Sequence, residues 1–144
     1  MSLVAQSEIT VAGPVAAVFE RFIHFPGWKD WMPRSFRPVR GPSRPLKEGD
    51  RIVVSIAGLP SRLHVEKVDR AREVCWSGGL GPIVHARHSF VFEADGEDKT
   101  RIRSVEPWTG AAIRVGPVAR FIEHRATAIG EQQLRGFARS FTAE

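Results

Sequence analysis

Residues 84–108 read VHARHSFVFEADGEDKTRIRSVEPW, and the alternation of side chains in this stretch decides the fold class. A period of two puts Phe90 and Phe92 on one side of a strand over 84–94, and Ile102 and Trp108 on one side of a strand over 100–108. The polar residues between them are too few for anything but a short turn. We therefore expect two antiparallel neighbours with one buried face.

Similar runs lie upstream and are separated by short connections. The same period predicts strands at 7–11, 52–56, 63–68 and 73–78, with a turn at 58–60 after the second of them. Connections of this length suit an antiparallel meander.

Helical periodicity appears at both ends of the chain. Apolar residues three and four apart predict a short helix within 14–25, which Pro26 and Gly27 end, and a second short turn should carry Trp28 and Trp31. In the last third, a longer apolar stripe predicts one long helix, with members Val118, Ile122, Ala126, Ile129, Phe137 and Phe141. The order of elements indicates an α+β fold. We expect one domain over 1–144, in which a curved antiparallel sheet of about six to seven strands grips the C-terminal helix.

The composition is that of an ordinary globular domain. The chain has 144 residues, 42% hydrophobic and 26% charged, and a single cysteine, Cys75, which cannot form an intrachain disulfide and which we expect to be structural. No leader peptide and no membrane-spanning run is evident, so we expect a cytoplasmic protein. The composition leaves open whether it is a monomer or a homodimer.

The net charge of +5 is concentrated in one segment. Residues 29–51, the basic segment, hold seven basic and three acidic residues together with four prolines. Proline excludes a continuous helix and confines any strand to a short edge piece. Aromatic residues do not alternate with the charges as base-stacking platforms would, so a solvated surface loop is favoured over nucleic-acid binding.

Several motifs in this order resemble the START-like (SRPBCC) superfamily, which includes polyketide cyclase/dehydrase-type proteins, coenzyme Q-binding proteins and pollen-allergen-type carriers. The matching segments are AGPVAAVF (12–19), WKDWMP (28–33), VD (68–69), EVCWSG (73–78), HSFVFE (88–93), KTRI (99–102) and EPWTG (106–110). The resemblance spans residues 7–141. It implies a helix-grip fold, with a cavity between the concave face of the sheet and the last helix.

Strand parity then sorts the residues that would face such a cavity. The predicted ligand-binding set combines inward-facing strand residues with residues of the covering helix: Trp76, His88, Phe90, Phe92, Glu106, Trp108, Val118, Ile122 and Arg125. A few polar groups inside an aromatic wall suit a largely apolar ligand. Trp28 and Trp31 would cap the cavity mouth or pack under the basic segment.

Glu106 and His88 are the candidates for catalysis. A buried Glu106 has two interpretations: a ligand-binding or general acid/base carboxyl, or half of an ion pair with Arg125. His88 is either a satisfied core histidine or a proton-transfer group. The direction of His64 depends on whether its strand has a bulge between 63 and 68.

These residues favour binding of a small apolar ligand, which would be aromatic, polyketide-like or lipid-like. The first alternative is a polyketide cyclase or aromatase-like enzyme that uses His88 and Glu106 for proton transfer; the second is a basic module that binds nucleic acid or an acidic partner. The histidines have no metal-ligand spacing and no phosphate-binding loop is present, so we expect neither a metal nor another cofactor.

Overall fold

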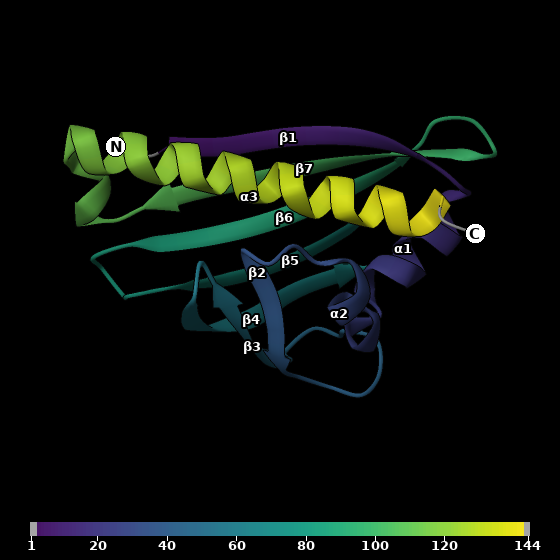
Figure 1. Cartoon of the computed structure of the whole chain (residues 1–144), viewed down its shortest axis with the longest axis horizontal. Helices are drawn as coiled ribbons and strands as arrows, with labels where there is room; N and C mark the ends of the chain where they lie inside the picture. Colours follow the sequence, from purple (N-terminus) through teal and green to yellow (C-terminus); the bar gives the residue numbers. More distant parts are fainter. Residues whose placement is uncertain (1–2, 143–144) are drawn as a thin grey trace.

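The computed structural model describes residues 3–142 and contains one seven-stranded antiparallel sheet (Figure 1). The strand order is β1-β7-β6-β5-β4-β3-β2, and the sheet curls around one side of α3. The strands are β1 (Leu3–Ala12), β2 (Phe36–Arg40), β3 (Arg51–Ile56), β4 (Leu59–Asp69), β5 (Glu73–Gly79), β6 (His85–Ala94) and β7 (Lys99–Thr109). The expected α+β class with a curved antiparallel sheet is confirmed.

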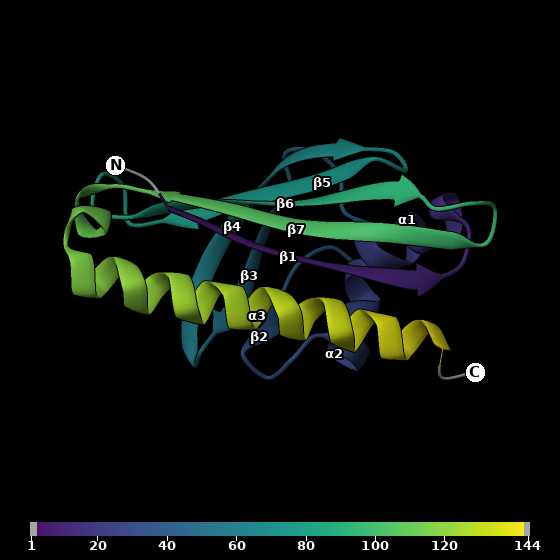
Figure 2. The same cartoon turned by 90° about the horizontal axis from the view of Figure 1, so that it is seen from above.

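The long C-terminal helix lies against the concave side of this sheet (Figure 2). It runs along β1 and touches α2 near its end. The helices are α1 (Val15–Ile23), η1 (Phe25–Gly27), α2 (Trp28–Trp31), η2 (Ala111–Arg114) and α3 (Gly116–Thr142). Within residues 3–142, no helix combines the length and the hydrophobicity that a membrane span needs.

Aromatic side chains fill one end of the space between sheet and helix. Phe22 of α1 is at the centre, with ring centroids 4.7–5.2 Å from those of Trp31, Phe90, Phe92 and Phe137. This aromatic core ties α1, α2, β6 and the C-terminal half of α3 together. The N-terminal half of α3 lies over the other end of the sheet, where the cavity described below is found.

The turn between β3 and β4 differs from the sequence prediction. It consists of Ala57 and Gly58, with φ values of 51° and 87°, whereas Leu59 and Pro60 already pair with β3. Two-residue hairpin turns with positive φ at both positions match the right-handed twist of the strands. The turn therefore comes earlier than predicted.

The basic segment is more ordered than a loop. It contains β2, which pairs only with β3 at the edge of the sheet and shifts register between Pro38 and Arg40. Leu46, in the same segment, is buried, and its amide donates to the Ile23 carbonyl. The proline-rich composition allowed the short edge strand that forms here.

Candidate functional site

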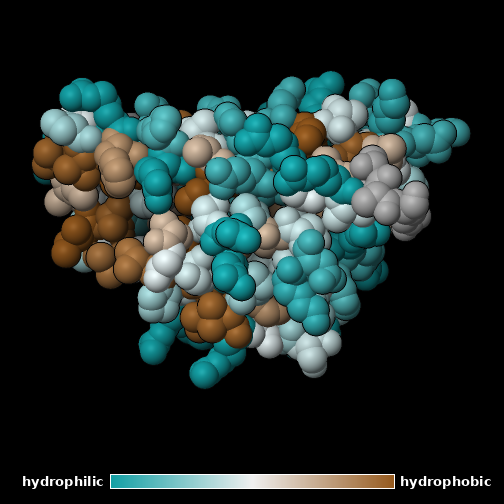
Figure 3. Space-filling view, viewed as in Figure 1, coloured by the Kyte–Doolittle hydropathy of each residue, from teal (hydrophilic) through white to brown (hydrophobic). Residues whose placement is uncertain are grey.

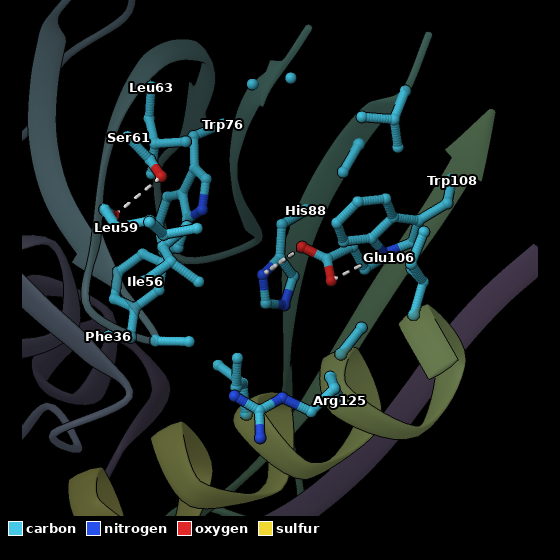
Figure 4. A pocket seen from close by; sticks show the side chains of 18 of the residues that line it. Phe36, Ile56, Leu59, Ser61, Leu63, Trp76, His88, Glu106, Trp108 and Arg125 are labelled. Carbon is cyan, nitrogen blue, oxygen red and sulfur yellow. Dashed lines mark hydrogen bonds and ion pairs between the residues drawn. The ribbon is translucent and has the colours of Figure 1, made fainter. Parts of the chain in front are cut away.

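A cavity of about 580 Å³ opens between the concave face of the sheet and the N-terminal half of α3 (Figure 4). Strands β2 to β7 and the β3–β4 hairpin supply its sheet side, and α3 supplies Phe121, Ile122, Arg125, Ala126 and Ile129. Most of the lining side chains are apolar, and the polar ones include His88, Glu106 and Arg125. The size and lining are those of a small-molecule site.

Glu106 and His88 form an ion pair in the cavity wall. Glu106 Oε2 lies 3.1 Å from His88 Nδ1, and the side chains are only 15% and 5% exposed, respectively. On the other side of the carboxylate, Trp108 Nε1 donates to Glu106 Oε1 over 3.0 Å. Strand parity brings these residues together, because Glu106 and Trp108 are two apart on β7 and His88 lies on the neighbouring strand β6.

The second nitrogen of His88 is also occupied. Nε2 lies 2.6 Å from Ser104 Oγ, and the ring stacks on Phe90 at a centroid distance of 4.2 Å. Gly130 of α3 covers Ser104, since a Cβ at that glycine would come 3.1 Å from the hydroxyl. The imidazole is thus held between Ser104 and Glu106, so to accept or donate a proton in the cavity it must release one of them.

Glu106 keeps its charge although it is largely buried. Burial acts to raise its pKa, but the attraction of His88 and the hydrogen bonds from His88 and Trp108 outweigh burial and hold the pKa below its ordinary value of 4.5. The site therefore presents an ionised carboxylate that already accepts two hydrogen bonds.

The alternative pairing of Glu106 with Arg125 is not what the structure shows. The carboxylate pairs instead with His88 on the neighbouring strand and accepts a hydrogen bond from Trp108 on its own strand. Arg125 lies on the cavity wall at α3, 6.0 Å from the centroid of the Phe121 ring, and is exposed.

The structure brings six of the nine predicted ligand-binding residues to the cavity wall and leaves three away from it. Those that line it are Trp76, His88, Glu106, Trp108, Ile122 and Arg125. Phe90 and Phe92 have the expected parity but lie further along β6, inside the aromatic core. Val118 lies at the start of α3, where it is 39% exposed.

Other singled-out residues lie away from the cavity. Trp28 and Trp31 are buried in the core, and neither lines the cavity. The strand of His64 does have a bulge, between Val65 and Lys67, but it comes after His64, whose Nδ1 lies 3.3 Å from Glu66 Oε1. Cys75 is fully buried, and burial raises the pKa of its thiol. Across residues 3–142, no three His, Cys, Asp or Glu side chains gather as metal ligands would.

Sequence reasoning missed the wall formed by β2 and the β3–β4 hairpin. Phe36, Ile56, Leu59 and Leu63 line the cavity there. The period-two pattern of Ile52, Val54 and Ile56 could have indicated that Ile56 faces the cavity, since residues of one parity face one side of the sheet. Nothing in the local pattern indicates that Leu59, at the end of a hairpin, reaches the cavity.

An exposed apolar rim adjoins the cavity where α3 begins. The β5–β6 loop is tied to η2 by backbone hydrogen bonds from Ala111 to Pro82 and from Ala112 to Ile83. Large apolar side chains that are at least 39% exposed lie on this loop, on the residue after η2 and on the first turns of α3: Leu80, Ile83, Val115, Val118 and Phe121. Figure 3 shows hydrophobic surface at this end of the molecule. Phe121 connects the rim to the cavity, because it also lines it.

Comparison with known families gives one match. Residues 2–142 match the model of a family described as polyketide cyclase / dehydrase and lipid transport. No curated protein matches the chain.

Solved structures of low sequence identity share the fold. The Zhui aromatase/cyclase from Streptomyces sp. R1128 aligns with a TM-score of 0.70 at 18% identity, covering 99% of this chain and 98% of that one. A truncated norcoclaurine synthase from Thalictrum flavum gives 0.74 at 12% identity, covering 100% and 96%. A START superfamily protein from Mycobacterium smegmatis gives 0.73 at 14% identity, covering 97% of each chain. At these identities the likeness concerns the fold.

Proposed function

The chain belongs to the polyketide cyclase / dehydrase and lipid transport family, and on that basis we propose that it binds a small, largely apolar ligand in the cavity under α3. One observation carries this proposal: a cavity of about 580 Å³ with a mainly apolar lining and one buried polar pair, His88–Glu106. The aromatic walls at Trp76 and Trp108 favour a flat or chain-like apolar body.

The polar pair gives the ligand an orientation. Both ring nitrogens of His88 already have partners, Ser104 and Glu106. The Glu106 carboxylate accepts two hydrogen bonds and retains lone pairs that can accept more. A hydroxyl or N–H group of the ligand can donate to that carboxylate. The ligand would therefore be an apolar molecule with at least one hydrogen-bond donor on its buried part.

Binding of a neutral apolar fluorophore tests the proposal. N-phenyl-1-naphthylamine should bind with submillimolar affinity, gain emission intensity and quench tryptophan fluorescence. Trp108→Leu should weaken binding several-fold, because Trp108 lines the cavity. Phe141→Leu is the matched control: it also replaces an aromatic residue, but one that packs on Phe137 away from the cavity. Absence of binding to the wild type, or equal losses in the two variants, would refute the proposal.

A second candidate is a cyclase-like enzyme, favoured by the buried carboxylate–imidazole pair itself. A carboxylate that fixes one nitrogen of an imidazole is an arrangement that general acid/base catalysis uses. If the pair transfers protons, Glu106→Gln should abolish turnover of a poly-β-keto substrate while leaving fluorophore binding nearly intact. If the pair only orients a ligand, the wild type should return such a substrate unchanged apart from its spontaneous reaction.

A further inference from the structure

Arg125 is a charged side chain of the cavity wall for which residues 3–142 supply no acidic partner. The ionisable residues of the lining are His88, Glu106 and Arg125, and the first two pair with each other. The ion pairs found within residues 3–142 do not include Arg125. Its guanidinium carbon lies 6.0 Å from the centroid of the Phe121 ring. A cation is thus available to a ligand at the α3 side of the cavity.

The position of Arg125 suits the end of a ligand and not its middle. It is exposed, whereas Glu106 and His88 are buried deeper in the wall. Figure 4 shows its guanidinium at the α3 side, across the open space from the His88–Glu106 pair. A molecule that lies along the apolar wall could therefore place one end against Arg125 while its body reaches the pair.

The charges of the site decide which end carries the anion. An anionic group beside Glu106 would be repelled by an ionised carboxylate in surroundings of low dielectric constant, whereas at Arg125 it meets an unpaired cation. The guanidinium presents parallel N–H donors that match the two oxygens of a carboxylate. With a single arginine available and a carboxylate in the same cavity, a monoanion fits better than a doubly charged phosphate ester.

We propose that the cavity takes a monocarboxylate amphiphile, with Arg125 binding the carboxylate at the cavity mouth and the apolar body lying against the aromatic wall. This inference rests on the proposed apolar-ligand function and adds to it the chemical class of the ligand. It makes Arg125 a specificity-determining residue.

A matched set of ligands tests the inference. The affinities to be measured are those of 2-naphthoic acid, 2-naphthylmethanol and 2-naphthyl phosphate. These ligands have the same aromatic body and differ only in the head group. The wild type should bind the acid about ten-fold or more tightly than the alcohol, as a charge-assisted hydrogen bond allows. In Arg125→Met the acid and the alcohol should bind within about two-fold of each other, because the apolar part of the side chain is kept and the cation is lost. Arg120→Met, on the same helix but outside the cavity lining, should keep the wild-type preference.

The outcomes separate this inference from the function on which it rests. If N-phenyl-1-naphthylamine binds but the wild type does not prefer the acid, the carboxylate inference is wrong and the apolar-ligand function stands. A preference that survives in Arg125→Met, or tighter binding of the phosphate than of the acid, also overturns it. If the neutral fluorophore does not bind, the proposed function fails and the inference fails with it.

Discussion

Glu106 illustrates how a single buried residue can stay ionised. Its carboxylate is held by His88 on the neighbouring strand and by Trp108 two residues along its own strand. His88 is in turn held by Ser104, so four side chains on β6 and β7 form one hydrogen-bonded unit. Such a unit is costly to break in part, because each member left unpaired would be buried without a partner.

The stability of the protein should depend on the ionisation of Glu106. A carboxyl whose pKa is lower in the folded than in the unfolded chain stabilises the fold fully above its ordinary value of 4.5, and loses that contribution as the pH falls through the folded pKa. In Glu106→Gln the free energy of unfolding should be lower by roughly 1–3 kcal/mol at pH 7. Its decline between neutral and acidic pH should also be shallower than in the wild type, as chemical denaturation at a series of pH values would measure.

A surface ion pair provides the control for this measurement. Glu93 pairs with Arg103 at 2.7 Å, but both side chains are nearly half exposed. Exposed pairs contribute little to stability, so Glu93→Gln should resemble the wild type at every pH. If Glu106→Gln also follows the wild-type pH profile, the His88–Glu106 pair does not stabilise the fold.

At the level of elements, the glycines of α3 set how closely it approaches its neighbours. Glycine weakens a helix by about 1 kcal/mol relative to alanine, so two in one helix need a packing reason. A Cβ at Gly136 would overlap the carbonyl oxygen of Trp31 on α2, whereas one at Gly130 would come 3.1 Å from the Ser104 hydroxyl. Gly136 thus lets α3 lie against α2, and Gly130 lets it lie over the strand that carries Ser104.

The two glycines should respond differently to alanine. Gly136→Ala should lower the free energy of unfolding by roughly 1–3 kcal/mol despite the better helix former, because a backbone oxygen cannot move aside without shifting α2. Gly130→Ala should cost less, since a Cβ there comes only within 3.1 Å of the Ser104 hydroxyl, which can yield by a few tenths of an ångström without breaking its hydrogen bond to His88. Urea unfolding of the two variants compares them directly. Equal stability of Gly136→Ala and the wild type would show that the helices separate at no cost.

Over the whole molecule, the aromatic core and the cavity divide the space under the sheet. The core lies where α1, α2 and the end of α3 meet β6, and the cavity lies where the first half of α3 faces the β3–β4 hairpin. Strands β5, β6 and β7 are paired on both sides, while β2 at the edge is paired with β3 alone. The central strands therefore support one wall of the cavity, and the β3–β4 hairpin, beside the edge strand β2, forms a second wall.

Ligand binding should be visible in amide hydrogen exchange as an ordering of that second wall. With N-phenyl-1-naphthylamine bound, exchange should slow most in the β3–β4 hairpin and in residues 121–129 of α3, which line the cavity. The central strands should change less, because they are already protected. Slowing confined to the aromatic core, with none in the hairpin, would contradict the location of the site.

Much of the fold was predictable because it depends on local periodicity. Alternation over 84–94 and 100–108 predicted β6 and β7 to within one residue at each end, and the stripe from Val118 to Phe141 predicted α3. The turn at Ala57 and Gly58 was misplaced, because glycine and proline signal a turn without saying which residues adopt positive φ.

For the site, the sequence could predict only which face of the sheet each strand residue is on. The sequence predicted that Trp76, His88, Glu106 and Trp108 share the concave face of the sheet: alternation sorted the residues within each strand, and the family resemblance implied which face is concave. The tertiary structure decided what covers each of them: Phe90 and Phe92 lie under α1 and the end of α3, and Glu106 meets His88 and not Arg125. Strand alternation predicts which face of the sheet a side chain is on. It does not predict how far along the strand that side chain lies from a helix that comes later in the chain. That position depends on the curvature of the sheet and on the path of α3, which only long-range packing determines.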